Sequence, residues 1–315
     1  MSNPLREIMA RVKNALVQDT HEISRAVSTP PREVGRGLLD GIQHVGDAER
    51  QGLHGLQRRF DDRGGQLPWI RGSPRYTPDR AERRLQNMRL TPDPQRTDML
   101  PDTVNRTQVM RAHDLLPWRN EKTWVIFKPS AGEIFGLRNW LPHVPGTLAR
   151  REVAAYRMDR LFGFGLVPPT ALVTRGGREG SIQQFVEFGG VKWAMGFDDL
   201  QRQRAAVLHH VIGAADGQRG NYRPDRNGNL VLFDHGLSFP EKPDPNMETD
   251  FLPRSDFVTF DPKERLDDDV LRAVDSIDEQ DIRDALTDLD IAPSAIEGVL
   301  ERLNQIRELR AIPGT

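Results

Sequence analysis

Two carboxylates and an amide lie close together in the sequence and are of the types that bind Mg²⁺. Asp216 follows a predicted helix, Asn221 comes five residues later, and Asp234 ends the apolar run NLVLF. If the connecting loop folds back, the three side chains converge. Their oxygens are hard ligands suited to Mg²⁺, with phosphate and water completing the shell. One carboxylate can instead accept a proton from an attacking hydroxyl.

A lysine and a glutamate upstream form a second chemical pair. Lys128 lies in the apolar run TWVIFKP, where a lone ammonium is costly to bury and needs an anionic partner. Glu152 lies about one turn into the helix predicted to follow. A Lys–Glu pair of this kind can hold a lysine against nucleotide phosphates.

The elements that must position these residues change in type along the chain. Apolar spacing predicts a helical arm, then a β-rich segment that contains one helix, then a helical end. This order predicts an α+β fold with a small sheet lobe on a helical lobe, and it excludes a doubly wound parallel sheet. The predicted strands are 123–129, 166–174, 181–188 and 229–239. The predicted helices are 4–18, 33–59, 147–163 (N-cap Thr147), 198–216, 269–277, 278–289 and 293–309.

Four motifs, in this order, resemble the phosphatidylinositol 3-/4-kinase-like branch of the protein-kinase fold, and its bacterial members most. They read Phe127-Lys128-Pro129, then REVAAY at 151–156, GLVPPT at 165–170 and Asp234-His235-Gly236. The resemblance covers roughly residues 120–305. It implies a two-lobed, lipid-kinase-like fold with a β-rich N-lobe and a helical C-lobe.

The resemblance also implies roles for the five residues above. Lys128 would contact the phosphates of ATP, and Glu152 would orient Lys128. Asp216 would be the catalytic-loop aspartate. Asn221 and Asp234 would hold Mg²⁺.

The resemblance gives no sequence motif for the adenine site or for the phosphate loop, so both are assigned from neighbouring elements. Strand 181–187 would lead to the hinge, where the backbone of Val186, Glu187 and Phe188 would read the adenine. No glycine occurs between Gly72 and Gly132, so the phosphate loop is either Asn105-Arg106-Thr107 or residues 130–136. Many lipid-kinase relatives have Asp-Arg-His in the catalytic loop, whereas this chain has Asp216-Gly217-Gln218.

Composition and charge bound the remaining chain. Of its 315 residues, 37% are hydrophobic and none is cysteine, which excludes a disulfide scaffold and thiol catalysis. No apolar run approaches the ~18 residues of a membrane span, and the N-terminus lacks the apolar stretch of a signal peptide. A cytoplasmic location is therefore expected, with a secreted effector that lacks a signal peptide as the alternative.

The two ends of the chain carry opposite charge. Residues 1–120 hold 20 Arg and Lys, 19 of them Arg, against 15 Asp and Glu, while residues 241–315 hold 9 against 20. We predict an Arg-rich, helical and loosely structured region at 1–115, with residues 61–101 as a linker that is poor in large apolar side chains. This region could bind an acidic partner. A kinase-like domain follows, with an N-lobe at 116–190 and a C-lobe at 191–315.

Three functions remain open from the sequence. The first is an ATP- and Mg²⁺-dependent kinase whose acceptor is a protein rather than a lipid. The second is a pseudokinase or nucleotide-binding module, including an enzyme that transfers the nucleotide (adenylylation). In the third, the arm at 1–115 acts by binding a partner. A metallohydrolase built on His209 and His210 is disfavoured, because both lie among apolar residues of a predicted helix.

Overall fold

The described part of the chain lies within one compact unit, residues 75–315. The structure is a computed structural model that describes residues 76–98, 107–113, 122–133, 144, 146–175, 177–241, 253–260 and 264–313. The helices predicted at 4–18 and 33–59 lie outside the described residues, as does the Arg-rich arm before residue 76.

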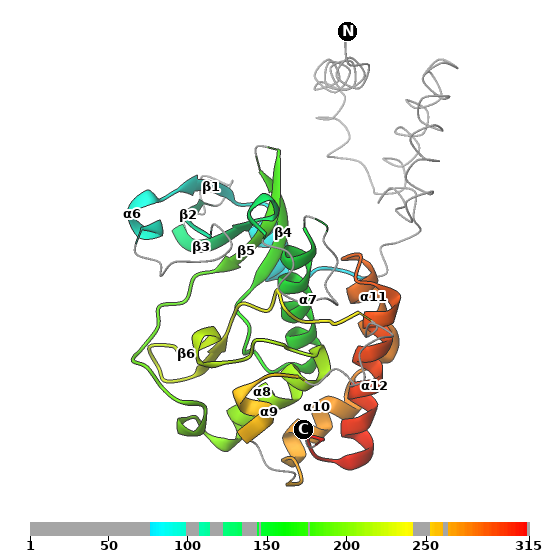
Figure 1. Ribbon diagram of the computed structural model, residues 1–315. Coiled ribbons are helices and arrows are strands. Elements are labelled where there is room, and N and C mark those ends of the chain that lie inside the picture. The colour runs from blue at the N-terminus through cyan, green and yellow to red at the C-terminus, as the bar shows by residue number, and fades with distance from the viewer. Residues whose placement is uncertain are drawn as a thin grey trace, which may run out of the picture. The chain divides into compact units, whose positions relative to one another are not determined.

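A five-stranded antiparallel sheet forms the first lobe (Figure 1). Its strands lie in the order β1-β2-β3-β5-β4. Their bounds are β1 Arg89–Pro92, β2 Gln108–His113, β3 Lys122–Pro129, β4 Thr170–Arg175 and β5 Arg178–Gln184. The predicted strand 166–174 starts later, at Thr170, because the carboxylate of Asp159 accepts the N–H groups of Leu166 and Val167 and two prolines follow.

Strand β3 has two faces, as the alternation of side chains in a strand requires. Val125 and Phe127 are buried in a small apolar core on one face. Ile126 and Lys128 therefore lie on the opposite face. Gly180 of β5 faces the end of β3, and a Cβ there would lie 2.4 Å from the carbonyl oxygen of Lys128. Only glycine allows this close pairing.

The part of the predicted linker (61–101) that the structure describes beyond residue 79 is not a linker, and the segment that follows it also belongs to the sheet. They contribute helix α5 (Arg80–Gln86), β1, the short helix α6 (Pro94–Thr97) and β2, so the β-rich lobe begins before residue 116. β1 is a four-residue edge strand that is mostly exposed, so backbone pairing with β2 holds it and few apolar side chains are needed. Leu85 and Met88 join the apolar core of the sheet.

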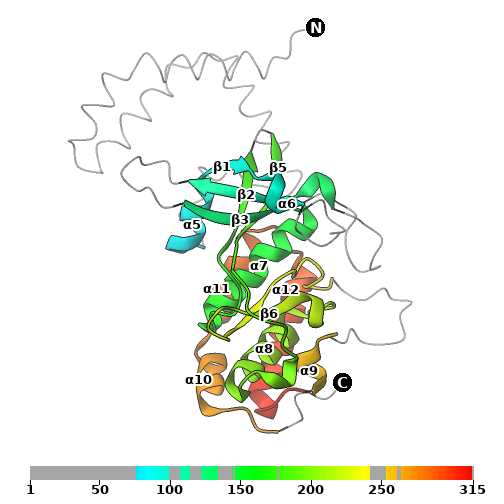
Figure 2. The same cartoon turned by 90° about the vertical axis from the view of Figure 1, so that its left-hand side faces the viewer.

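Helix α7 (Thr147–Phe162) packs against β4 and β5 on one side and against helices of the second lobe on the other (Figures 1 and 2). Its N-cap is Gly146, not the predicted Thr147, which is the first helical residue. The Glu133 carboxylate accepts the N–H groups of Gly146 and Ala149, each at 2.9 Å, and so replaces a local side-chain cap. Gly163, with φ of 68°, ends the helix.

A buried cluster of charges fixes α7 in place. The guanidinium of Arg157 bonds the carboxylate of Glu82 in α5 (Nη2–Oε1, 2.6 Å), and neither side chain is more than 2% exposed. Its Nη1 donates to the carbonyl oxygen of Ala285 (2.9 Å) and to Oδ2 of Asp288 (2.8 Å) in the second lobe. The ring of Tyr76 stacks on the guanidinium. We call these residues the Arg157 cluster.

The second lobe is mainly helical and contains the larger apolar core. Its helices are α8 Asp199–Ile212, α9 Asp256–Phe260, α10 Asp268–Ser276, α11 Glu279–Thr287 and α12 Pro293–Leu309, and a hairpin of β6 (Tyr222–Pro224) and β7 (Leu230–Leu232) lies among them. The three acidic C-terminal helices are confirmed within one or two residues. The predicted α+β fold class, with a β-rich first lobe and a helical second lobe, is likewise confirmed. In the part of the chain that is described, no helix is both long and apolar enough to cross a bilayer.

Candidate active site

Three of the predicted residues meet where the sheet faces α7. Lys128 Nζ lies 2.5 Å from Oε1 of Glu152 and 2.8 Å from Oδ1 of Asp234. The lysine comes from β3, the glutamate from α7, and the aspartate from the segment after β7. Residues separated by more than 100 positions in the chain therefore share one ammonium group. We call these three residues the Lys128 cluster.

The charges of this cluster set the protonation states of its members. Burial alone would lower the pKa of Lys128, but the carboxylates of Asp234 and Glu152 outweigh burial and raise it. Burial raises the pKa of Glu152 against the opposing effect of Lys128. The Lys128 ammonium holds the pKa of Asp234 below its usual value. Lys128 is therefore charged at neutral pH and is paired with a charged Asp234.

The backbone after β7 turns sharply to bring Asp234 to the lysine. Asp234 has φ of 62°, in the left-handed region that non-glycine residues seldom occupy. The next N–H, that of His235, donates to Oε2 of Glu152 at 3.0 Å. Glu152 thus holds the lysine with one oxygen and the segment that carries Asp234 with the other. Because the Asp234 side chain is 46% exposed, part of its carboxylate remains open to solvent.

Asp216 and Asn221 form a second pair, in the loop between α8 and β6. Helix α8 ends at Ile212, not at 216 as predicted, because Gly213 adopts φ of 61° and caps it. Asn221 Nδ2 donates to the carbonyl oxygen of Asp216 (2.7 Å) and to its Oδ2 (2.9 Å). Gln218 Nε2 donates to the other carboxylate oxygen of Asp216.

The backbone joins this pair to the Lys128 cluster. The N–H of Phe233, the residue before Asp234, donates to the carbonyl oxygen of Asn221 at 3.0 Å. The structure therefore brings all five predicted residues into one region, in two directly bonded groups linked by this hydrogen bond. Within the described ranges, no three His, Cys, Asp or Glu side chains are grouped to hold a metal ion.

The predicted hinge residues lie beyond the strand rather than in it. β5 ends at Gln184, so Val186, Glu187 and Phe188 belong to the connection that follows. Phe188 makes a β-bridge to Asp225, and its ring packs on that of Phe233 with centroids 5.3 Å apart. The connection thus passes beside the residue that precedes Asp234.

Two apolar residues near Lys128 were not singled out from the sequence. Ile126 lies two residues before Lys128 on the same face of β3, and Val109 is its cross-strand partner in β2. Cross-strand partners share a face, so both side chains lie on the lysine side of the sheet. The period-2 alternation of strand 123–129 could have identified Ile126, but Val109 depends on a strand pairing that the sequence did not reveal.

The predicted phosphate loops are only partly described. Asn105, Arg106 and residues 134–136 lie outside the described part of the chain. Ser130–Gly132 form a short 3₁₀ turn, and the Glu133 carboxylate is used to cap α7.

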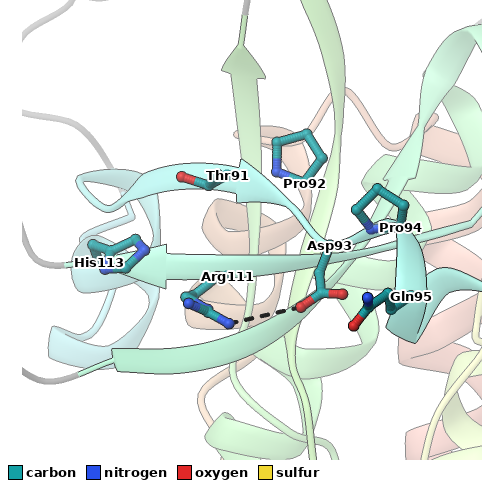
Figure 3. Close-up of a pocket in the computed structure, with 7 residues that line it drawn as sticks. All are labelled: Thr91, Pro92, Asp93, Pro94, Gln95, Arg111 and His113. Carbon is teal, nitrogen blue, oxygen red and sulfur yellow. Dashed lines mark ion pairs between the residues drawn. The ribbon is translucent and has the colours of Figure 1, made fainter.

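A separate open hollow lies at the β1 side of the sheet (Figure 3). It has a volume of about 470 Å³, and Arg111 and Asp93 form an ion pair of 3.8 Å within it. The guanidinium of Arg111 also stacks on Trp124. None of the predicted site residues lines the hollow. Its lining consists of Thr91, Pro92, Asp93, Pro94, Gln95, Arg111 and His113.

Comparisons with known proteins give matches among solved structures. No protein-family model matches the chain, and no curated protein matches it either. The proinflammatory kinase CtkA of Helicobacter pylori is similar at a TM-score of 0.38 and 13% identity, over 68% of this chain and 90% of that one. The Golgi casein kinase is similar at a TM-score of 0.40 and 12% identity, over 75% of each chain. Hydra Fam20, solved with sugar, is similar at a TM-score of 0.38 and 12% identity, over 67% of this chain and 86% of that one. At these levels the likeness does not by itself assign an activity to this chain.

Proposed function

We propose that this protein is an ATP- and Mg²⁺-dependent phosphotransferase of the phosphatidylinositol 3-/4-kinase-like type, and that its acceptor is a protein. One observation carries the proposal. A strand lysine bridges a helix glutamate and a partly exposed aspartate, 2.5 and 2.8 Å away, next to a bonded Asp–Asn pair. Phosphoryl transfer needs such a set: a cation for the phosphates, oxygen ligands for a metal, and a carboxylate near the acceptor hydroxyl.

The residues present fit Mg²⁺. Nδ2 of Asn221 is used on Asp216, so the amide oxygen points away from that bond and is free to act as a ligand. Asp234 offers a carboxylate that is partly open to solvent. Both are hard oxygen donors. When bound, Mg²⁺ supplies positive charge that offsets the charge of the phosphates.

Each remaining side chain then has a task that its contacts support. Lys128 presents its ammonium to the phosphates, and the hydrogen bond to Glu152 fixes the position of that ammonium. Asp216 accepts the proton of the acceptor hydroxyl, with its carboxylate oriented by Asn221 and Gln218. On the lysine face of the sheet, the partly exposed Ile126 would offer apolar surface for the adenine, with its buried partner Val109 supporting it, and the backbone of residues 186–188 would bind the adenine edge.

A second candidate is a protein that binds nucleotide without transferring phosphate. The contact between Gln218 and Asp216 favours it, because Gln218 stands where many lipid-kinase relatives have histidine. An amide is neutral at every pH, so it cannot add positive charge to the transition state. Nucleotide binding would then serve to order the protein rather than to drive chemistry.

The deciding experiment is incubation with labelled ATP, with Mg²⁺ or with EDTA. We expect Mg²⁺-dependent self-phosphorylation, hydrolysis or transfer, with the label taken from the γ-phosphate. Asp216→Ala and Asp234→Ala should each abolish turnover while the circular dichroism spectrum is unchanged. Retained turnover in both variants contradicts the proposal. Binding without turnover in the wild-type chain supports the second candidate, and transfer of an α-phosphate label identifies adenylylation.

A further inference from the structure

Exposed apolar side chains gather on the segment that connects the two lobes. In the described ranges six large hydrophobic side chains are exposed, and four of them lie within residues 188–195. They are Phe188, Val191, Trp193 and Met195. Single exposed hydrophobics are common, but a local cluster marks a surface for interaction.

This cluster lies against the loop that carries Asp216. The guanidinium of Arg219, three residues after Asp216, stacks on the Trp193 ring at 3.8 Å from its centroid. The 3₁₀ turn Ala194–Gly196 packs against α9. The segment before α9 is tied to the same loop, because the N–H of Gly217 donates to the carbonyl oxygen of Arg254 at 2.8 Å. Trp193 and Arg219 therefore lie in contact close to Asp216, and the backbone of Arg254 is bonded to the residue that follows Asp216.

Two exposed arginines near this apolar surface carry positive charge. Arg219 and Arg254 are both exposed, and neither forms an ion pair with another described residue. A cation on an aromatic face keeps its charge available to an approaching anion. An indole paired with an arginine is typical of the residues that dominate protein interfaces.

We propose that Val191, Trp193 and Met195, with Arg219 and Arg254, form the docking surface for a segment of the acceptor protein. That segment would carry an apolar side chain flanked by Asp or Glu. The inference rests on the proposed function, and it names the substrate class: a protein with an acidic, apolar-anchored sequence near the modified hydroxyl. Docking beside Asp216 would place that hydroxyl within its reach.

The acidic residues at both ends of the segment favour a protein over a membrane surface. Glu187 precedes the cluster, and Asp198 and Asp199 follow it, all three exposed or nearly so. Glu187 and Asp199 are paired with Arg226 and Arg202, so an anionic bilayer would meet a surface of mixed charge and not a continuous basic patch. A peptide can place its acidic side chains only where the arginines are.

The test measures peptide binding and phosphate transfer separately on the full chain. Fluorescent pools of twelve-residue peptides, each with one central Ser or Thr, would be compared: an Asp/Leu-rich pool, the same pool with Asn for Asp, and the same pool with Ala for Leu. We expect the Asp/Leu pool to bind best. Trp193→Ala and Arg254→Gln should each weaken that binding by about tenfold or more. ATP hydrolysis without peptide should be unchanged in Trp193→Ala.

Matched controls come from exposed residues elsewhere in the chain. Leu309→Ala, at 59% exposed on α12, and Arg178→Gln on β5 should leave peptide binding unchanged. Equal binding of the three pools, or a preference that neither test variant alters, overturns the docking surface. Binding to phosphatidylserine vesicles that depends on Trp193 and Arg254 also overturns it, in favour of a membrane. If ATP does not bind but Trp193-dependent peptide binding persists, the phosphotransferase function fails and the docking surface stands.

Discussion

Helix α7 carries two clusters of opposite charges that are five residues apart in sequence and differ in how closed they are. In the Arg157 cluster both Glu82 and Arg157 are fully buried, and the guanidinium is shared among a carboxylate, a carbonyl oxygen and Asp288. In the Lys128 cluster the lysine is partly exposed and Asp234 is nearly half exposed. The first cluster closes its cation off from solvent, although Asp288 is 41% exposed, whereas the second leaves its cation 18% exposed.

This difference teaches which feature marks a site. Burial and pairing of charge do not mark a site by themselves, because the Arg157 cluster is more deeply buried and equally paired. It joins α5, α7 and α11 and so fixes the helix that carries Glu152. The Lys128 cluster leaves a partly exposed ammonium beside its exposed carboxylate, so an incoming anion or metal can compete there. One helix thus has an anchor and a reactive group within two turns.

The largest effect is expected from breaking the closed cluster. Arg157→Met leaves Glu82 buried without a cation, and we expect it to lower the free energy of unfolding by about 3–5 kcal/mol. Urea unfolding measures this loss. Arg160→Met, on the same helix but about half exposed in its pair with Asp79, should cost far less. Nucleotide binding should persist at temperatures where Arg157→Met is folded. A small loss of stability together with lost nucleotide binding would reverse the roles of the two clusters.

Lowering the pH tests His235, the buried residue whose N–H donates to Glu152 of the Lys128 cluster. Burial, with a smaller contribution from Lys128, lowers the pKa of His235 to about 4. The native state therefore keeps His235 neutral, while the unfolded chain takes up a proton as pH falls through about 6.5. Stability is thus lost between pH 6.5 and 4, by about 2 kcal/mol from pH 7 to pH 5 for this residue.

The measurement is urea unfolding of wild type and His235→Asn at both pH values. The variant should lose about 2 kcal/mol less than wild type on acidification. Asp159 acts in the opposite direction, because burial raises its pKa to about 7 and its contribution falls as pH rises. It is present in both proteins and cancels in the difference. Equal acid sensitivity of the two proteins would show that His235 takes up its proton at the same pH in the native state as in the unfolded chain.

Breaking the open cluster should cost less stability but more function. In Lys128→Met, Glu152 keeps the N–H of His235 and can take up a proton, and Asp234 can turn to water. We expect a loss of about 2 kcal/mol, the usual cost of a buried polar group that loses one partner. Calorimetry should show that Mg²⁺–ATP no longer binds. Lys192→Met, whose ammonium lies over Phe197 instead of a carboxylate, is the matched control and should bind normally.

The residue types of the site could be predicted from the sequence, because each charged side chain stands out against its apolar neighbours in the chain. A lysine in an apolar strand and an aspartate at the end of another are each awkward without a partner, and they do become partners in the structure. Element ends were predicted less well. Gly213 ends α8 four residues early by taking a left-handed conformation, and the sequence alone allowed the helix to continue across it.

The first part of the sheet was missed for a different physical reason. β1 has one edge exposed and needs only backbone bonds to β2, so its composition resembles that of a linker. Helix α5 contributes Glu82, which the sequence alone suggests is a surface residue. In the structure it is buried against Arg157, which lies 75 positions later in the chain. Long-range pairing of buried charges leaves no periodic pattern in the sequence.

The smallest effect is expected from an ion pair that is neither closed nor at the site. Arg283 and Glu297 join α11 to α12 with an Nη1–Oε1 distance of 2.5 Å, yet both side chains are largely in solvent. Water already solvates both charges, so Arg283→Ala should change neither the urea midpoint nor ATP binding measurably. If this variant instead destabilises the protein as much as Arg157→Met does, geometry of pairing rather than burial governs these clusters. The distinction between the anchor and the reactive group on α7 would then lose its physical basis.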